Sequence, residues 1–228
     1  MDEELDDFAM TERTRVRRHP ERGVYDHETA YAILDEALYC HLGWVDPNGS
    51  PRIVPTIHVR AGNTLYVHGS NASRTLRSSR EGGEVCVCVT LLDGLVLARS
   101  AFNHSMNYRS VVVYGVAREV TDPNEKWEAQ RALVDHVVRG RSADARMPDQ
   151  RELDQTTIMA IPLDAVSSKV RTGPPKDDED DIDLGVWAGV LPFVQVPGEA
   201  IPSPDLRADV DIPAYVRRYE RPGGGAGS

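Results

Sequence analysis

Runs of alternating apolar and polar residues, separated by turn signals, dominate the chain after its first helical stretch. The first run covers 39–45 and ends at Asp46-Pro47-Asn48-Gly49, a strong turn signal. Runs at 52–60 and 64–68 follow, joined by Ala61-Gly62-Asn63. Alternation with a period of two is typical of strands with one buried face. Further strands are predicted at 85–90, 95–101, 109–120, 158–162 and 165–170.

Three segments have helical character instead. Asp26 can cap a helix whose apolar residues share one face, and 71–80 reads as a short polar helix. The strongest helix pattern covers 123–138, with Pro123 in its first turn. Most gaps between strands are too short for the helical crossovers that a parallel sheet requires. The expected fold is therefore mainly β (α+β), a six- to seven-stranded antiparallel barrel with a few flanking helices.

The charged and flexible regions predict the domain boundaries. Residues 1–18 read as a disordered acidic lead-in, and 19–193 as one folded domain. Residues 194–228 are rich in proline, glycine and charge, so we expect an extended or disordered tail, with 215–219 as a stretch that could be anchored.

The composition of the chain argues against some classes of binding partner. The 228 residues include 26 basic and 36 acidic side chains, a formal net charge of -10, which opposes general binding to nucleic acid or anionic membranes. No apolar run approaches the ~20 residues that cross a bilayer, and no signal peptide is visible. The cysteines are an odd set without metal-ligand spacing, Cys40, Cys86 and Cys88. We expect a cytoplasmic protein without a protein-bound metal site.

The segment from Leu65 to Arg74 could bind a phosphate group. A strand ends at His68, Gly69 permits close backbone approach, and a polar helix start follows. Backbone N–H groups, hydroxyls and a guanidinium would converge there, as a phosphate monoester requires. An ordinary capped helix start explains the same residues equally well.

The segment from Asp93 to Ser110 combines two strands with a loop dense in hydrogen-bonding side chains. Such loops at a barrel mouth often carry sites, although many are simply solvated. His68 and His104 are the candidates for acid–base chemistry, with a structural histidine as the alternative. Motifs of hydrolase elbows, P-loops and dinucleotide-binding folds are absent.

Together these residues resemble the pyridoxamine 5'-phosphate oxidase-related FMN-binding split-barrel family, and within it the branch of nitroimidazole-resistance (Nim) proteins. The resemblance covers about 17–193. The matching stretches are Glu21 to Asp26, Ile33-Leu34-Asp35, Leu65 to Ser70, Asp93 to Ser100, His104 to Val111, Ser168 to Asp177 and Trp187 to Pro192. Where many relatives have Pro-Gly-Arg-Trp, this chain has Arg139-Gly140-Arg141-Ser142, and no substrate-phosphate set for vitamin B6 oxidation is found.

The resemblance implies a homodimer with FMN at the subunit interface. It implies phosphate contacts from Ser70, Ser73 and Arg74, and ring contacts from Pro55, Thr56, Ala98, Arg99 and Ser100. His68, Gly69 and His104 would also line the cofactor, and the second subunit would add Tyr108, Arg109 and Trp187. His68 corresponds to the active-site residue of Nim-like proteins.

Two functions are expected to compete. The first is an FMN-dependent oxidoreductase that reduces a small electrophile, a nitro-aromatic or quinone-like molecule, with nicotinamide-derived electrons and a proton from His68 or Tyr108. The second is a non-catalytic flavin- or haem-binding carrier or sensor, in which His68 or His104 would ligate haem. A structural protein with a degenerate site is the third alternative.

Overall fold

The computed structural model describes residues 7–70 and 83–221, and this part of the chain contains ten strands. The strands are β1 (Gly23–Val24), β2 (Tyr39–Val45), β3 (Pro51–Ala61), β4 (Thr64–Ser70), β5 (Glu84–Leu97), β6 (Ser105–Val116), β7 (Arg118–Glu119), β8 (Thr156–Pro162), β9 (Ala165–Arg171) and β10 (Gly189–Pro192). The helices are α1 (His27–Glu36), α3 (Pro123–Val137), α4 (Arg141–Asp144), α5 (Gln150–Gln155) and α6 (Ala214–Arg217), with single 3-10 turns at η1 (Pro20–Arg22), η2 (Ala101–Asn103) and η3 (Glu179–Asp181). None of these helices is long and apolar enough to span a membrane.

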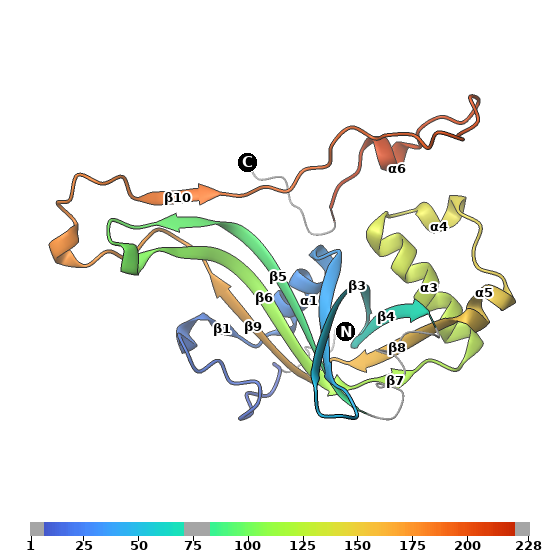
Figure 1. Cartoon of the computed structure of the whole chain (residues 1–228), viewed down its shortest axis with the longest axis horizontal. Helices are drawn as coiled ribbons and strands as arrows, with labels where there is room; N and C mark the ends of the chain where they lie inside the picture. The colour runs from blue at the N-terminus through green and yellow to red at the C-terminus, as the bar shows by residue number, and fades with distance from the viewer. Residues whose placement is uncertain (1–6, 71–82, 222–228) are drawn as a thin grey trace, which may run out of the picture.

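All strand pairs are antiparallel, and they follow the order β1-β9-β6-β5-β2-β3-β4-β8-β7, with β10 added to β5. The long strand β3 joins the two halves of the sheet, because Pro51–Ile57 pairs with β2 and His58–Ala61 pairs with β4. The chain returns between the halves through the β8–β9 turn (Figure 1). The expected mainly β, antiparallel split-barrel fold is confirmed.

The barrel interior is an apolar core closed by α1. Asp26 caps this helix, as the sequence predicts, because its carboxylate accepts a 2.6 Å hydrogen bond from the Thr29 backbone N–H. Ala30, Ile33 and Leu34 on α1 are buried against the inner faces of the strands. The strand residues of this core are Leu42, Leu65, Val67, Val85, Val87, Val89, Val111, Val113, Ile161 and Val166.

Helix α3 covers a second, smaller cluster on the other face of β4 and β8. Ala129 of α3 packs with Val120, Ile158 and Ala160, and Tyr66 lies against them. The Tyr66 hydroxyl also donates a 2.9 Å hydrogen bond to the Glu125 carboxylate at the start of α3. The two faces of β4 are therefore both covered along most of its length.

Strands β5 and β6 form a ribbon that continues beyond the barrel as an arm. A β-bulge at Leu92/Gly94 separates the barrel part from the arm, and β10 pairs with the arm part of β5 (Figure 1). The sequence predicts two strands, 85–90 and 95–101, because Asp93-Gly94 resembles a turn; here it is a bulge in one strand. Gly94 is required for the close approach of β10, since an added Cβ would lie 2.7 Å from the Leu191 carbonyl oxygen.

The C-terminal end of α1 is capped by side chains from three distant elements. His58 Nε2 of β3 donates to the Leu34 carbonyl at 2.9 Å, and His136 Nε2 of α3 donates to the Ala37 carbonyl at 2.8 Å. Arg221, near the chain's end, donates through Nε to the Glu36 carbonyl at 3.0 Å. These are carbonyl groups that a helix end leaves without intrahelical partners.

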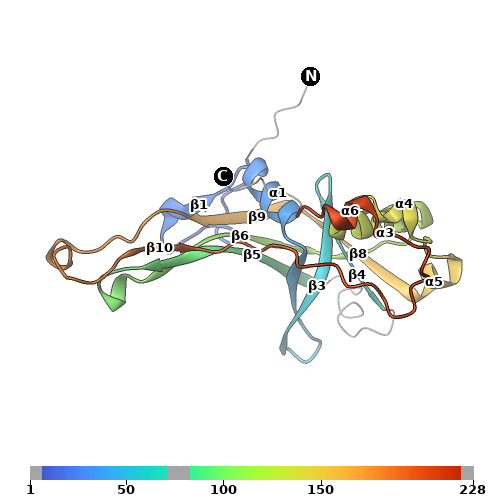
Figure 2. The same cartoon turned by 90° about the horizontal axis from the view of Figure 1, so that it is seen from above.

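Both terminal regions are attached to the domain. Residues 7–18, which the sequence predicts to be disordered, lie against it: Phe8 is buried in the core, and its N–H donates to the Tyr25 carbonyl. The segment after β10 is extended and runs the length of the molecule to α6 (Figure 2). There the Tyr215 hydroxyl donates to Asp144 of α4 at 2.6 Å and accepts from Arg141.

Candidate functional site

The end of β4 presents the histidine that the sequence analysis selected. His68 alternates with the buried Leu65 and Val67, so it lies on the α3 side of the strand, opposite Ile158 of β8. Its Nδ1 atom is buried and has no hydrogen-bond partner among residues 7–70 and 83–221. Burial lowers the pKa of His68 below its ordinary value, so the ring is neutral at pH 7. A neutral imidazole with an unsatisfied nitrogen is suited to a ligand contact.

The predicted phosphate-binding residues fall mostly outside the described part of the chain. Ser73 and Arg74 lie outside it altogether, and Gly69 and Ser70 are described as the last two residues of β4. The prediction that these residues hold a cofactor phosphate therefore stays a prediction.

Pro55 and Thr56 lie on β3, close to the β4 end. Pro55 pairs with His41 of β2, which in turn pairs with Cys88 of β5. His41 is exposed, and its ring makes an edge contact with Tyr39 at 5.8 Å between centroids. The sequence analysis did not select His41, although the alternation in 39–45 places it on the outer face opposite the buried Cys40 and Leu42.

The second predicted group lies at the far end of β5. Ala98 is buried, and the Arg99 backbone N–H and guanidinium each donate to the Asp177 carboxylate at 2.7 Å. The Ser100 hydroxyl is buried without a partner. His104 is exposed, and its Nδ1 lies 2.8 Å from the Ser100 carbonyl oxygen. Because a carbonyl only accepts, Nδ1 carries the proton and Nε2 is left as the acceptor.

Tyr108 and Arg109 lie between the two groups, on β6. Arg109 is held by two carboxylates, that of Glu36 at the end of α1 and that of Asp93 at the bulge. The hydrogen bonds that its guanidinium donates to Asp93 and Glu36 raise the pKa of Arg109 above its ordinary value. The Arg109 guanidinium therefore binds carboxylates of its own chain. Tyr108 is half-buried and lies opposite Arg171 of β9.

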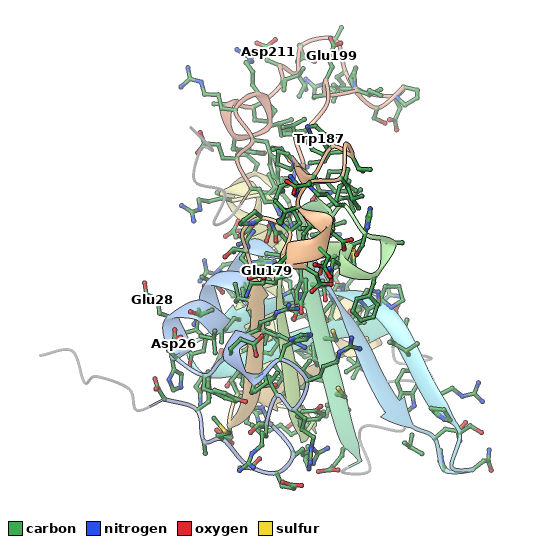
Figure 3. The ribbon with its side chains drawn as sticks, turned by 90° about the vertical axis from the view of Figure 1, so that its left-hand side faces the viewer. Asp26, Glu28, Glu179, Trp187, Glu199 and Asp211 are labelled. Atoms are coloured by element: carbon green, nitrogen blue, oxygen red, sulfur yellow. The ribbon has the colours of Figure 1, made fainter. Side chains whose placement is uncertain are left out.

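Trp187 lies on the segment that leads into β10. Figure 3 views the molecule from the end of the arm and shows Trp187 above Glu179 of the same segment. The indole is 67% exposed and folds back over Gly189, where an added Cβ would lie 2.9 Å from two ring atoms. Register places Gly189 opposite Leu97, so the ring lies near the arm end of β5.

One chain does not bring all the predicted residues together. Across the sheet, Pro55 of β3 is level with His41 of β2 and with Cys88 of β5. Ala98 lies ten residues further along the chain than Cys88, and a strand rises ~3.3 Å per residue. About 30 Å therefore separates the two groups. We call the first group the barrel group; its members are Pro55, Thr56, His68, Gly69 and Ser70. We call the second group the arm group; its members are Ala98, Arg99, Ser100, His104 and Trp187.

The described residues contain no group of three or more His, Cys, Asp or Glu side chains that could hold a metal ion. The three cysteines are free thiols. Burial raises the pKa of Cys40 to about 12, and the pKa of the half-buried Cys86 is also raised by burial. Neither Cys40 nor Cys86 is therefore activated as a nucleophile.

Comparison with known proteins identifies the family. The family model described as pyridoxamine 5'-phosphate oxidase matches residues 26–170. The flavocytochrome Anf3 from Azotobacter vinelandii is 37% identical, with 92% of this chain and 97% of that chain covered and a TM-score of 0.86. The FAD and haem binding protein from Mycobacterium smegmatis is 34% identical, with 86% and 96% covered and a TM-score of 0.82.

The likeness to the nitroimidazole-resistance branch is more distant. A 5-nitroimidazole antibiotic resistance protein from Bacteroides thetaiotaomicron is 22% identical, with 65% of this chain and 86% of that chain covered and a TM-score of 0.56. That level of similarity shows a common fold only. The comparison with curated proteins gives no match. From the family match and the two similar structures we conclude that this chain belongs to the pyridoxamine 5'-phosphate oxidase family.

Proposed function

We propose that this protein is a flavocytochrome, a redox protein that binds FAD and haem. The observation that carries the proposal is the likeness to a flavocytochrome and to an FAD and haem binding protein, at 37% and 34% identity. The first match covers 92% of this chain, so it extends well beyond residues 26–170 of the family model. It therefore includes much of the arm and tail, not the barrel alone.

A bound flavin would supply the hydride and electron transfer that no side chain of this protein can perform. The barrel group offers a place for it, because the buried Nδ1 of His68 lacks a partner. The sequence analysis expected FMN from the family resemblance; the FAD named for the Mycobacterium smegmatis relative favours the dinucleotide here.

A second copy of the chain would complete the site. The barrel and arm groups are about 30 Å apart in one chain, which is longer than a flavin ring system. In the dimer that we propose, a twofold axis would bring the arm group of one copy to the barrel group of the other. Large exposed apolar side chains lie at both places, Tyr39 and Ile53 near the first and Phe102, Met106 and Trp187 near the second. Burial of these side chains would stabilise such a dimer.

His104, rather than His68, would be the haem ligand in this proposal. Histidines that ligate metals usually donate their second ring nitrogen to a carbonyl or carboxylate, which fixes the tautomer. His104 has this arrangement, with Nδ1 on the Ser100 carbonyl at 2.8 Å and Nε2 as the free acceptor. His68 lacks it, because its Nδ1 has no partner.

The test is the absorption spectrum of the purified, untreated protein. We expect a flavin band pair together with a haem Soret band, and FAD rather than FMN among the released cofactors. His104→Ala should remove the Soret band and retain the flavin, and the matched His68→Ala should retain the Soret band. Absence of both chromophores after reconstitution would reject the proposal, and loss of the Soret band only in His68→Ala would reassign the ligand.

The proposal extends to catalytic turnover. A reduced flavin in this pocket would reduce a small electrophile, such as a nitro-aromatic or a quinone, with electrons from a nicotinamide donor. The half-buried Tyr108 hydroxyl would deliver the proton, or His68 would do so after its ring has taken up a proton from solvent. Nicotinamide oxidation should exceed that of free flavin and fall in His68→Gln and Tyr108→Phe. If several acceptors give no rate above free flavin, the protein is a carrier or sensor rather than an enzyme.

A further inference from the structure

Two matching stretches of the family contain basic residues to which the site described above gives no role, and the fold brings these residues together. The stretches are Glu21 to Asp26 and Ser168 to Asp177. Strand β1 pairs with β9, with Gly23 opposite Lys169, so Arg22 lies beside β9. Lys169 and Arg171 lie two residues apart on one face of β9, roughly 7 Å from each other along the strand.

Arg171 is the one buried arginine among the residues that the structure describes, with 7% of its surface exposed. All its hydrogen bonds go to neutral oxygens: the Asn107 side-chain carbonyl, the Gly173 carbonyl and the Pro174 carbonyl. Arg99 and Arg109, by contrast, are each held by a carboxylate. Burial, and then the nearby charge of Arg22, lower the pKa of Arg171.

The two neighbouring cations are also poorly neutralised. The side chain of Arg22 is 23% exposed, and its carboxylate contact is Glu21 at 3.8 Å, beyond hydrogen-bond distance. Lys169 Nζ donates to the Arg18 carbonyl at 3.0 Å, and no ion pair of Lys169 is found in the described part of the chain. Tyr108, half-buried and directly opposite Arg171, adds a hydroxyl on the same face of the sheet.

Within the part of the chain that the structure describes, this lack of counter-charges is unusual. The chain has ten more acidic than basic residues, 36 against 26, so carboxylates are abundant. A partly buried charge without a counter-ion is costly, and an anion that joins the cluster would remove the cost. Guanidinium groups are well matched to phosphate and carboxylate oxygens.

We propose that Arg22, Lys169 and Arg171 form an oxyanion-binding subsite for a ligand with two negatively charged groups. Arg22 and Lys169 contact the ligand, and the buried Arg171 adds positive potential and holds the turn at Gly173. The identity of the ligand rests on the proposed function: the diphosphate of FAD and the paired carboxylates of haem have the required charge.

The subsite is tested first without any cofactor, by calorimetric titration of inorganic pyrophosphate into the cofactor-free protein. We expect Lys169→Gln and Arg22→Gln to weaken binding at least tenfold each, since neither contacts the Gly173 turn. Arg151→Gln, an exposed charge on α5, is the matched control and should bind as the unaltered protein does. Binding should also weaken with added salt. Pyrophosphate that binds all variants equally, or does not bind the unaltered protein, overturns the subsite.

The cofactors then identify the ligand. If Lys169→Gln weakens FAD but not FMN, the subsite holds the diphosphate; if it weakens haem alone, it holds the carboxylates; if it weakens neither, the ligand is a substrate. A protein that binds pyrophosphate through Lys169 but neither flavin nor haem would reject the proposed function and retain the subsite.

Discussion

The β5–β6 ribbon passes through two environments, and the contrast between them explains much of the molecule. In the barrel its side chains are apolar and buried, with Val87 and Val89 of β5 facing the same core as Val111 and Val113 of β6. In the arm, beyond the bulge, Leu92 and Met106 are exposed, and Phe102 at the tip is 92% exposed. Contacts there include ion pairs and hydrogen bonds, such as that of Arg99 with Asp177, and few apolar side chains are buried, among them Val96 and Ala98.

The same two strands are therefore stabilised by a broad apolar core at one end, and at the other by ion pairs beside a few buried apolar side chains such as Val96 and Ala98. Apolar burial is insensitive to ionic strength, whereas partly exposed ion pairs weaken as salt is added. The arm should open at lower cost than the barrel, which suits a region that is proposed to fit against a second copy.

The sharpest test uses two adjacent leucines of β5. Leu91 is 6% exposed in the barrel core and Leu92 is 43% exposed at the bulge. We expect Leu91→Ala to cost about 3 kcal/mol of unfolding free energy, because it removes buried methyl groups and leaves a cavity. Leu92→Ala should cost less than about 1 kcal/mol. Denaturant unfolding measures both, and equal losses would contradict the division between barrel and arm.

Arg109 joins the two environments, and its removal should be nearly as damaging. Arg109→Ala leaves the carboxylates of Glu36 and Asp93 without their cation, and we expect a loss of about 2 kcal/mol. Arg131→Ala, which breaks an exposed pair with Glu128 on α3, should cost less than about 0.5 kcal/mol. Both are measured by chemical denaturation at low and high salt; an equally small effect at Arg109 would mean that the pairs are not needed.

Gly94 tests the attachment of β10 to the arm. In Gly94→Ala the new methyl group would meet the Leu191 carbonyl at 2.7 Å, so β10 must move, at a cost of about 2 kcal/mol. Gly185→Ala is the control, because nothing lies within 4 Å of its added Cβ. Limited proteolysis should cleave the segment after η3 faster in the first variant. Unchanged protection there would show that β10 accommodates the methyl group.

The dependence of folding stability on pH tests the barrel, through the buried His58. Burial, together with the nearby charge of His136, lowers the pKa of His58 from 6.5 to about 4, although the hydrogen bond to the Leu34 carbonyl and the charge of Asp35 favour the charged form. The unfolded chain therefore binds more protons between these pH values. Stability is complete above about pH 6.5 and falls as the pH decreases, by up to about 2 kcal/mol from pH 7 to pH 5.

The corresponding experiment compares unfolding curves at the two pH values. His58→Gln should reduce the dependence on pH, whereas His41→Gln, at an exposed position of β2, should leave it unchanged. A dependence that survives in His58→Gln would assign the effect to other groups.

The contrast also explains what the sequence could predict. Where burial determines structure, alternation marks the strand, and the predicted 39–45 coincides with β2 (Tyr39–Val45). Where polar contacts determine structure, the pattern fails. Strand β10 (Gly189–Pro192) has four residues and no alternation, and it forms because Gly94 lets it approach β5. Phe8 gives too weak a signal within a charged segment to predict its burial.

The candidate site shows the same limit. His68 was selected from its place at the end of a strand, and the structure adds its unpartnered nitrogen. The distance between Pro55 and Ala98 depends on the register of β3, β2 and β5, which residue types do not reveal. The pairing of Arg109 with Glu36 joins residues 73 positions apart in the sequence, so no local motif predicts it.

The capped end of α1 has a consequence for the order in which the molecule is made. The bond from Arg221 to the Glu36 carbonyl spans 185 positions, and those from His58 and His136 span 24 and 99. During synthesis the helix end thus gains its donors in three stages, the last when almost the whole chain has emerged. Contacts between residues far apart in the chain form late, because closing a long loop costs conformational entropy before the contact can stabilise the fold. A ribosome-bound chain short of residue 221 would hold α1 with an open end, in a state distinct from the finished fold.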